Sequence, residues 1–388
     1  MAFTAEQREW QEKAWTFAEE EIRPISLERD LIADPRETFT WDIIEKGSQL
    51  GFRTAVVPKE YGGHGIDFVT QVLVMSELAR GDSAISKTFS QCWKWSHLIA
   101  ASCTPDQQRR FLTPFIEDDT FLLGKAGTEP TSGSDNRWRL DEVETGWKMT
   151  AERDGDEWVL NGVKRYIANG SVAKLFFVDT RTDPSASIRE GTTLFLVPAD
   201  SPGLRVGEVY DKIGWRFYQN AELIFEDVRV PHDNIVGEVN GGVKARAGDT
   251  SEFGDLELGA NALGVCDAAL EMALGHARTR WQGGDYIIEH QAIQLKISEM
   301  KMLTEALRAF VFRTAEEAEE GRVANNVSLM NFATDVIQRV THLNMDVHGG
   351  AGVMKDVGAE KLVRDSAIWT HLAGDSVQRM KVISRLQQ

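Results

Sequence analysis

The sequence predicts an α+β chain of several domains: a helical N-terminal domain, a middle domain that is an antiparallel β-barrel or sandwich, and a C-terminal four-helix bundle. Helical patterns fill the first part of the chain, and short strands with turn signals follow. Helical patterns too long for a compact α/β unit occupy the last part. A chain of 388 residues suits two or three packed domains, and we place them at residues 1–121, 122–235 and 236–388.

The first part has the features of a series of helices. Thr4 and Gln7 form a capping box, in which each side chain accepts a hydrogen bond from the backbone of the other. Hydrophobic residues then recur at helical spacing until Pro24, which is expected to end the helix. Further helical patterns cover residues 41–50, 70–79, 84–101 and 105–116.

Strand patterns occupy the middle of the chain. Asp154-Gly155 and Asn161-Gly162 are turn signals, and we expect the second to form a hairpin between strands at residues 158–160 and 163–167. Short strands are also expected at residues 147–151, 194–197 and 221–225. After Pro231, long helices are expected to form the bundle with the last segment of the chain, at residues 256–280, 290–318 and 327–348.

The composition argues against several classes of function. A net charge of −17 without a basic stripe does not suit nucleic acid or an anionic membrane surface. No apolar run approaches the roughly 18 residues that span a bilayer, and no signal peptide is recognisable. The three cysteines form no C-x-x-C pair, so we expect no metal cluster and a cytoplasmic location; they are Cys92, Cys103 and Cys266.

Several segments combine glycine with polar groups in a way that suits a ligand with ring carbonyls and phosphates. Residues 128–135 contain hydroxyls and turn amides that satisfy such oxygens. Gly349-Gly350 follows a helical pattern and lets backbone amides approach a ligand closely. Two further segments are residues 160–170 and residues 280–284, the latter followed by His290-Gln291. Taken alone, each pattern also occurs in ordinary loops.

Together these segments resemble the flavin-binding motifs of the acyl-CoA dehydrogenases, and the resemblance covers essentially the whole chain. It implies FAD as the cofactor. In the middle domain, the resemblance implies that Thr128 holds the flavin pyrimidine ring, that Ser134 holds the pyrophosphate and that Tyr166 packs against the flavin. Ala168 stands where the family has a threonine that bonds flavin N5, so a donor is missing there.

The C-terminal motifs imply an FAD site that is shared between subunits. In the family, the residues at the positions of Arg280 and Gln291 reach the FAD of a neighbouring subunit, and Gly349 and Gly350 match a conserved pair. Oligomerisation, as a dimer or tetramer of like or unlike chains, is therefore expected. The chain departs from the family pattern at Gly283, Asp346, Asp375 and Val377.

The most consequential departure concerns the catalytic base. The family's usual glutamate, which removes the substrate α-proton, is replaced by Ala373, and the alternative base position on the first C-terminal helix is Gly254. Asp255 or Glu252 is the expected relocated base if it faces the flavin. The alternative is that both are solvated acids favoured by the helix dipole. His371 is another candidate, although a lone histidine more often has a structural role.

Trp93, Trp95 and His97 lie in a helical segment that helps to line the acyl pocket in relatives. They are expected either to shape a bulky substrate site or to form an ordinary core stripe.

Three functions remain open. The first is an FAD-dependent oxidoreductase that forms a 2-enoyl thioester from an acyl-CoA by removing the α-proton and the β-hydride, with electrons passing to an electron-transfer flavoprotein or another acceptor in lipid or carboxylic acid catabolism. The second is a non-catalytic or half-site subunit of a heteromeric dehydrogenase, because the departures gather at flavin and base positions. The third is a flavin-dependent monooxygenase or eliminase on the same fold.

Overall fold

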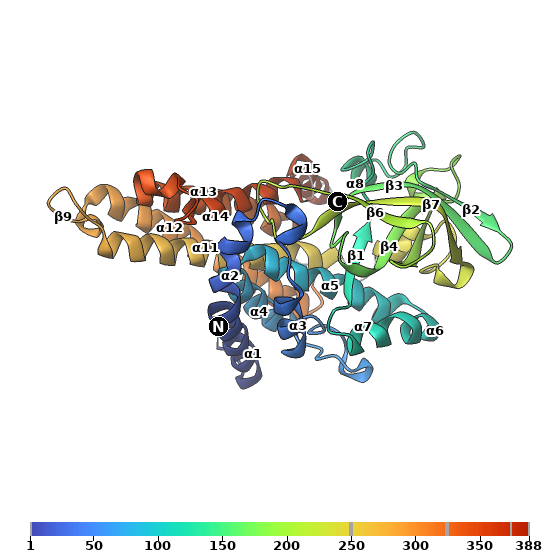
Figure 1. Ribbon diagram of the computed structural model, residues 1–388, viewed down its shortest axis with the longest axis horizontal. Coiled ribbons are helices and arrows are strands. Elements are labelled where there is room, and N and C mark those ends of the chain that lie inside the picture. Colours follow the sequence, from blue (N-terminus) through green and yellow to red (C-terminus); the bar gives the residue numbers. More distant parts are fainter. Residues whose placement is uncertain (1, 248–250, 323–325, 373–374, 387–388) are drawn as a thin grey trace.

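The computed structural model describes residues 2–247, 251–322, 326–372 and 375–386. Three parts follow one another along the chain, as predicted. In Figure 1 the β-sheet lies at one end of the molecule, a long helical arm extends to the other end, and the N-terminal helices pack between and beside them. None of the helices in the described ranges is long and apolar enough to cross a membrane.

The N-terminal part is a series of helices, and its α4 and α5 are largely buried. Pro24 does not end the first helix, contrary to our prediction. A π-helical turn at Ala18–Ile22 follows α1, and Pro24 then lies in the first turn of α2, where a missing N–H costs little. The helices are α1 (Ala5–Phe17), α2 (Arg23–Leu31), α3 (Trp41–Gln49), α4 (Phe68–Gly81), α5 (Ser83–Ser102), α6 (Pro105–Gln107) and α7 (Thr113–Glu117).

The middle part is a seven-stranded sheet that is mixed rather than purely antiparallel. β1 pairs in parallel with β4 and antiparallel with β3, while β2 also pairs with both, so these four strands form a closed ring. The strands are β1 (Leu122–Ala126), β2 (Thr150–Asp154), β3 (Glu157–Ala168), β4 (Ala173–Arg181), β5 (Thr192–Pro198), β6 (Leu204–Val209) and β7 (Asn220–Pro231). Short helices α8 (Asp135–Trp138), α9 (Ile188–Gly191) and α10 (Gly242–Ala247) accompany them.

The turn predicted at Asn161-Gly162 is wrong. β3 continues through both residues, and its register with β7 shifts between Leu160 and Gly162. Gly162 adopts a φ of +146°, and the Asn161 amide donates to the Asp227 carboxylate across the shift, 3.0 Å away. The pair therefore marks a β-bulge rather than a hairpin. Asp154-Gly155, in contrast, does connect β2 to β3.

The C-terminal part is a helical bundle with a small hairpin at its outer end. α11 packs extensively against α13 and also contacts α12 and α4. The elements are α11 (Ser251–Thr279), α12 (Gln291–Glu319), α13 (Asn326–His348), α14 (Ala359–Ser366) and α15 (Asp375–Leu386), with β8 (Trp281–Gln282) and β9 (Asp285–Tyr286) between α11 and α12.

A buried charged network joins the three parts. Lys361 of α14 donates to Asp82, which caps α5, at 2.9 Å and to Asp365 at 2.7 Å. Asp365 in turn accepts a hydrogen bond from the backbone N–H of Trp215, in the middle part, at 2.7 Å. The Trp215 ring packs edge-on against Trp369, with ring centroids 4.8 Å apart. Paired charges and aromatic packing thus fix the three parts relative to one another.

Candidate functional site

The structure brings together the four middle-domain residues that the sequence predicts for flavin binding. The backbone N–H of Arg165 donates to the carbonyl of Thr128 at 2.8 Å, which places the 128–135 loop beside Tyr166. Ala168 is the Cα partner of Lys125 on β1, at the start of the same loop. Tyr166, 57% exposed with a φ of +58°, lies where the β3 register shifts again, and its ring packs against Tyr210.

Donors in this loop are available to a ligand. Among the described residues, the hydroxyls of Thr128 and Ser134 make no hydrogen bond to another protein group. A Cβ added at Gly133 would meet no atom within 4 Å, so the space beside the loop is open. The loop is held from behind by buried Glu129, which accepts from the backbone N–H of Lys148 at 2.6 Å and from the Lys164 ammonium at 2.7 Å.

The predicted C-terminal residues form a second group at the outer end of the bundle. Arg280, Gln291, Gly349 and Gly350 are all exposed. The C-terminal ends of α11 and α13 lie side by side, because the His276 and His348 rings stack with centroids 4.3 Å apart. Figure 1 shows this end, marked by β9, pointing away from the sheet. One chain therefore does not bring the two predicted groups together.

Of the predicted base candidates, Asp255 is the one that the structure places in detail. It lies half-buried in the first part of α11. It acts electrostatically on Lys94 of α5 and on Arg137 of α8. We call this meeting point of α5, α8 and α11 the charged junction. The Glu252 backbone is also helical, but its side chain lies outside the described part, as does all of Ala373.

Two cations of the charged junction have no direct ion-pair partner among the described residues, and the sequence analysis missed both. Burial lowers the pKa of Lys94 to about 8, and Arg137 adds to this effect while Asp255 opposes it. Solvent reaches the Arg137 side chain, yet the surrounding protein still lowers its pKa through desolvation. Within the described ranges, neither side chain donates a hydrogen bond or forms an ion pair.

A second charged cluster lies under the sheet face next to Ala168. Asp179 of β4 is fully buried and pairs with Lys125 of β1 and with Arg246 of α10, whose Nε lies 3.3 Å from Oδ1. Burial by itself would raise the pKa of Asp179, but Arg246, Lys125 and Lys164 outweigh it and lower the pKa. Burial lowers the pKa of Lys125 to about 7 despite this pairing. The sequence analysis missed this cluster, and the signal that could have found it is an aspartate within an apolar strand.

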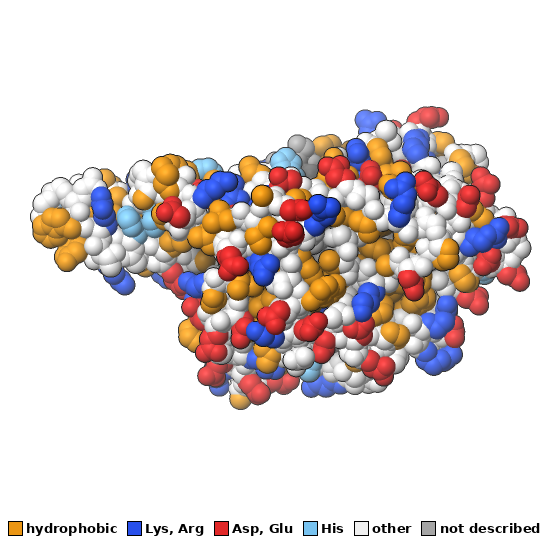
Figure 2. Space-filling model, in the orientation of Figure 1, with side chains coloured by type: hydrophobic (Ala, Val, Ile, Leu, Met, Phe, Trp, Pro, Cys, Tyr) orange, Lys and Arg blue, Asp and Glu red, His pale blue; other side chains and the backbone are white. Residues whose placement is uncertain are grey.

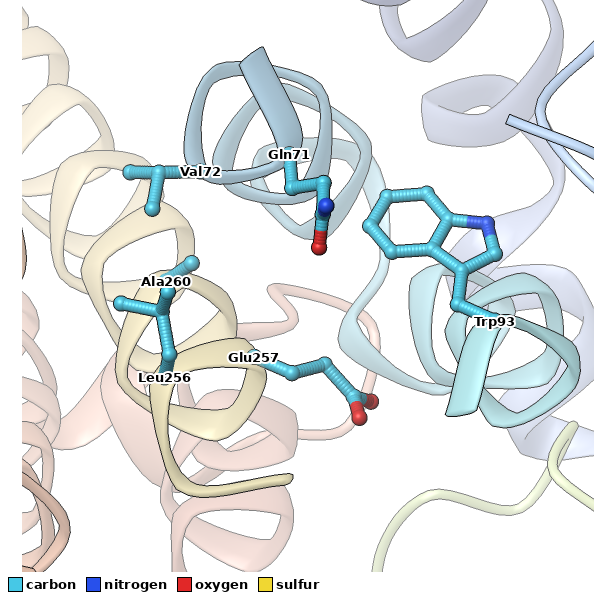
Figure 3. Close-up of a pocket in the computed structure, with 6 residues that line it drawn as sticks. All are labelled: Gln71, Val72, Trp93, Leu256, Glu257 and Ala260. Atoms are coloured by element: carbon cyan, nitrogen blue, oxygen red, sulfur yellow. The ribbon is translucent and has the colours of Figure 1, made fainter. Parts of the chain in front are cut away.

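A buried ion pair closes the space behind the charged junction. Glu257 of α11 accepts hydrogen bonds from Lys87 and from Ser90 of α5. Figure 3 shows the Glu257 carboxylate reaching from α11 toward the helix that carries Trp93. The cavity beside it measures only about 10 Å³, the space of about one water molecule. Glu257 is the charged residue among those that line this cavity.

The aromatic candidates have separate positions. Trp93 is buried and donates from Nε1 to the Phe52 carbonyl at 2.6 Å, so it belongs to the core and borders the small cavity. Trp95 is also buried and packs on Phe177, with ring centroids 4.9 Å apart. His97 is half-buried and has interactions of its own. His371 is exposed at the end of a 3-10 turn.

Two departures from the family motifs have local structural explanations. Gly283 and Gly284, with φ of +69° and +91°, form the tight turn between β8 and β9, which favours glycine over an aromatic residue. Asp346 is paired with Lys296, 2.7 Å from carboxylate to ammonium, so its charge is compensated within the chain. Asp375 is helical, but its side chain is outside the described part. In the same ranges no group of His, Cys, Asp or Glu suits a metal ion.

Comparison with known proteins identifies the family. The N-terminal, middle and C-terminal domains of acyl-CoA dehydrogenase match residues 4–119, 124–228 and 249–387. A probable acyl-CoA dehydrogenase of Bacillus subtilis (strain 168), YngJ, is 32% identical, with 98% of each chain covered. A 3-(aryl)acrylate reductase of Clostridium sporogenes (strain ATCC 15579) is 32% identical over the whole of both chains. The butyryl-CoA dehydrogenase structure from Megasphaera elsdenii covers all of both chains at 30% identity, with a TM-score of 0.92.

The chain therefore belongs to the acyl-CoA dehydrogenase family, and it is a flavin oxidoreductase that acts on CH–CH bonds. Its cofactor is FAD. The residues present suit this cofactor in one respect that the structure shows: the unpartnered Thr128 and Ser134 hydroxyls, the open space at Gly133 and the exposed Tyr166 ring lie together. Hydroxyl donors match flavin carbonyl and phosphate oxygens, and an aromatic ring matches the flavin plane.

Proposed function

We propose that the protein interconverts a short acyl thioester and its 2-enoyl thioester, with Asp255 as the group that exchanges the α-proton. When bound, FAD supplies the acceptor for the β-hydride. The observation that carries the proposal is the charged junction, where Asp255 lies in the first part of α11 and acts electrostatically on Arg137 of α8, the short helix that follows the 128–135 loop. Electrons would then pass to an electron-transfer flavoprotein or a similar acceptor.

Two features of the chain support a short acyl group. The buried Glu257 pairs with Lys87 at the end of the charged junction, so a charged pair lies there rather than an apolar side chain. The adjoining cavity holds about 10 Å³. A long alkyl chain would have to separate this ion pair, which is costly because it leaves a buried charge without its partner.

We further propose that two copies of this chain complete each other's FAD sites. Within one chain, the predicted group lies at the outer end of the bundle, which points away from the sheet (Figure 1). The same end exposes hydrophobic side chains, visible at the tip of the arm in Figure 2. They include Trp281, Tyr286, Leu295 and Met302, which are 58%, 46%, 65% and 63% exposed. A surface of this kind is typical of an interface between subunits.

The test begins with the purified chain and its FAD-to-chain ratio. Asp255→Asn should retain FAD and lower the rate of anaerobic flavin reduction by an acyl-CoA about 10²- to 10⁴-fold, the usual contribution of a general base. Asp335→Asn, at an exposed helix position, is the control and should reduce at the wild-type rate. Normal reduction by Asp255→Asn with loss in Glu252→Gln would assign the base to Glu252; normal reduction by both would reject a relocated base.

A half-site subunit in a heteromer is the second candidate. Ala168 places a methyl group, rather than a hydroxyl donor, beside the flavin-binding loop, and its side chain is half-buried there. This reading predicts substoichiometric FAD in the isolated chain, restored by a similar partner chain that carries the missing glutamate and threonine. Near one FAD per chain, retained by the protein alone, would rule it out.

A further inference from the structure

The charged junction has more positive than negative charge, although the chain as a whole carries a net charge of −17. The electrostatic environment of Lys94 contains two other cations, Arg137 and Lys87, and two carboxylates, Asp255 and Glu257. Lys87 and Glu257 neutralise each other as a buried pair. Arg246 and Asp179, which also act on Arg137, pair with each other. Among the side chains that the structure describes, this leaves Lys94 and Arg137 with the carboxylate of Asp255, an excess of one positive charge.

The position of Lys94 on α5 directs it toward α11. Lys87, Ser90 and Lys94 recur at the spacing of one helix face. The first two of these residues donate to Glu257 of α11. Lys94 occupies the next position along that face, and its ammonium lies 5.5 Å from the centre of the Trp95 ring. The Lys94 ammonium therefore lies at the end of the Lys87–Glu257 ion pair, rather than on an outer surface of the molecule.

Two buried donors in the same region also lack acceptors among the described residues. The Trp95 side chain is 6% exposed, and its Nε1 has no hydrogen-bond partner. The Tyr218 side chain is 3% exposed, and its hydroxyl also has none. Tyr218 lies within electrostatic range of Glu257, and burial raises its pKa. Buried donors without a partner are costly, so they indicate a group that supplies acceptor oxygens.

We propose that the acyl group of the substrate ends in a carboxylate and that Lys94, supported by Arg137, binds it. This inference rests on the proposed function, because it assigns the substrate class of the same site. A carboxylate is an acceptor-only anion, so it compensates both the excess charge and the unpaired donors. The Glu257–Lys87 pair limits the length of the acyl chain, which favours a short dicarboxylic acyl thioester over a fatty acyl thioester.

Binding of matched thioesters to the FAD-loaded protein tests the proposal. Glutaryl-CoA and pentanoyl-CoA have five-carbon acyl groups that end in a carboxylate and a methyl group, and titration calorimetry gives both dissociation constants. The wild-type protein should bind glutaryl-CoA about 10- to 100-fold more tightly, the effect of one charged hydrogen bond. Lys94→Met should abolish this preference and leave pentanoyl-CoA within about twofold, while Lys94→Arg should largely restore it.

Three results would overturn the proposal. Equal affinity of the wild-type protein for the two thioesters removes the carboxylate site while leaving the proposed function intact. If Lys94→Met weakens the binding of both thioesters and of free CoA equally, Lys94 binds a CoA phosphate instead of the acyl carboxylate. Failure to bind either thioester in an FAD-loaded protein rejects the proposed function as well. Lys174→Met, at an exposed lysine paired with Asp118, controls for the loss of one positive charge.

Discussion

Asp179 lies in an apolar strand with its side chain fully buried, and the cations around it keep its carboxylate charged. Lys125 and Arg246 contact its carboxylate directly, and Lys164 is close enough to lower its pKa further. Lys125 is also the Cα partner of Ala168, so the cluster lies directly beside the predicted flavin-binding residues. The charges of this site consequently come from side chains of four different elements, β1, β3, β4 and α10.

Asp179→Asn tests this cluster. Loss of the carboxylate removes the ion-pair partner of the largely buried Lys125 ammonium and one partner of Arg246, so the free energy of unfolding should fall by about 3–5 kcal/mol. Urea unfolding of the two proteins measures the difference. Asp154→Asn removes an exposed ion pair with Arg229 and should change the stability by at most about 1 kcal/mol. Equal losses of unfolding free energy in the two variants would show that the buried Asp179 ion pairs stabilise the protein no more than the exposed Asp154 pair does.

The charge of Lys94 makes anion binding depend on pH. Burial, with Arg137 and Lys87, lowers its pKa to about 8, and Asp255 and Glu257 only partly oppose this. The amine is therefore charged below about pH 8 and loses its proton above it. Affinity for glutaryl-CoA should be highest below pH 8 and fall by up to about tenfold per pH unit above it.

Calorimetric titrations between pH 6.5 and 9.5 measure this dependence, and the conservative variant provides its control. Arginine stays protonated throughout the range, so Lys94→Arg should lose the decline above pH 8. Pentanoyl-CoA should show no comparable decline with the wild-type protein. An identical decline in the wild-type protein and in Lys94→Arg would assign the titration to another group.

At the scale of elements, the β8–β9 hairpin departs from the family motif but still exposes aromatic side chains. Gly283 and Gly284 make the tight turn, while Trp281 and Tyr286 pair across it with ring centroids 5.2 Å apart. The rings are exposed at the tip of the arm. The hairpin thus presents aromatic side chains next to the position where the family motif has its own aromatic.

Replacement of both aromatics tests the hairpin as an interface. Trp281→Ala with Tyr286→Ala should raise the dissociation constant of the oligomer at least about tenfold, because exposed aromatics often dominate interface energies. Sedimentation velocity over a concentration series measures it. Trp15→Ala, an exposed tryptophan on α1, should leave the association unchanged. An unaltered oligomer in the hairpin variant would remove the arm tip from the interface.

For the whole molecule, the Lys361 network is the feature that connects all three parts. The Lys361 ammonium is 7% exposed and pairs with Asp82 and Asp365, which are themselves buried. Burial opposes its charge, but the two carboxylates outweigh this effect and raise its pKa. Because Asp365 also binds the backbone N–H of Trp215, removal of the lysine reaches the middle part as well.

Lys361→Met should lower the free energy of unfolding by about 3–5 kcal/mol, since two buried carboxylates lose their cation. In calorimetry, Lys361→Met should also show separate unfolding transitions, whereas the wild-type protein should show a more cooperative transition. Lys296→Met breaks the more exposed pair with Asp346 and should cost at most about 1 kcal/mol. A single unchanged transition in Lys361→Met would show that other contacts hold the three parts together.

Local patterns predicted much of the fold. Most helices appear close to the predicted ranges, because hydrophobic spacing and caps such as Thr4 with Gln7 act between near neighbours. Local signals misled at Pro24, which a π-helical turn accommodates, and at Asn161-Gly162, where a bulge replaces a turn. Both cases depend on how the surrounding backbone packs.

The sequence by itself determined the order of helices, sheet and bundle, the motif residues around Thr128 and Tyr166, and the missing glutamate at Ala373. Only the tertiary structure decided that the sheet is mixed and that the arm tip, which carries one group of predicted site residues, points away from the sheet. It also decided that Lys94 and Asp255 come within electrostatic range of each other. The physical reason is that charges distant in sequence interact only after α5 and α11 pack together, and local periodicity carries no information about that packing.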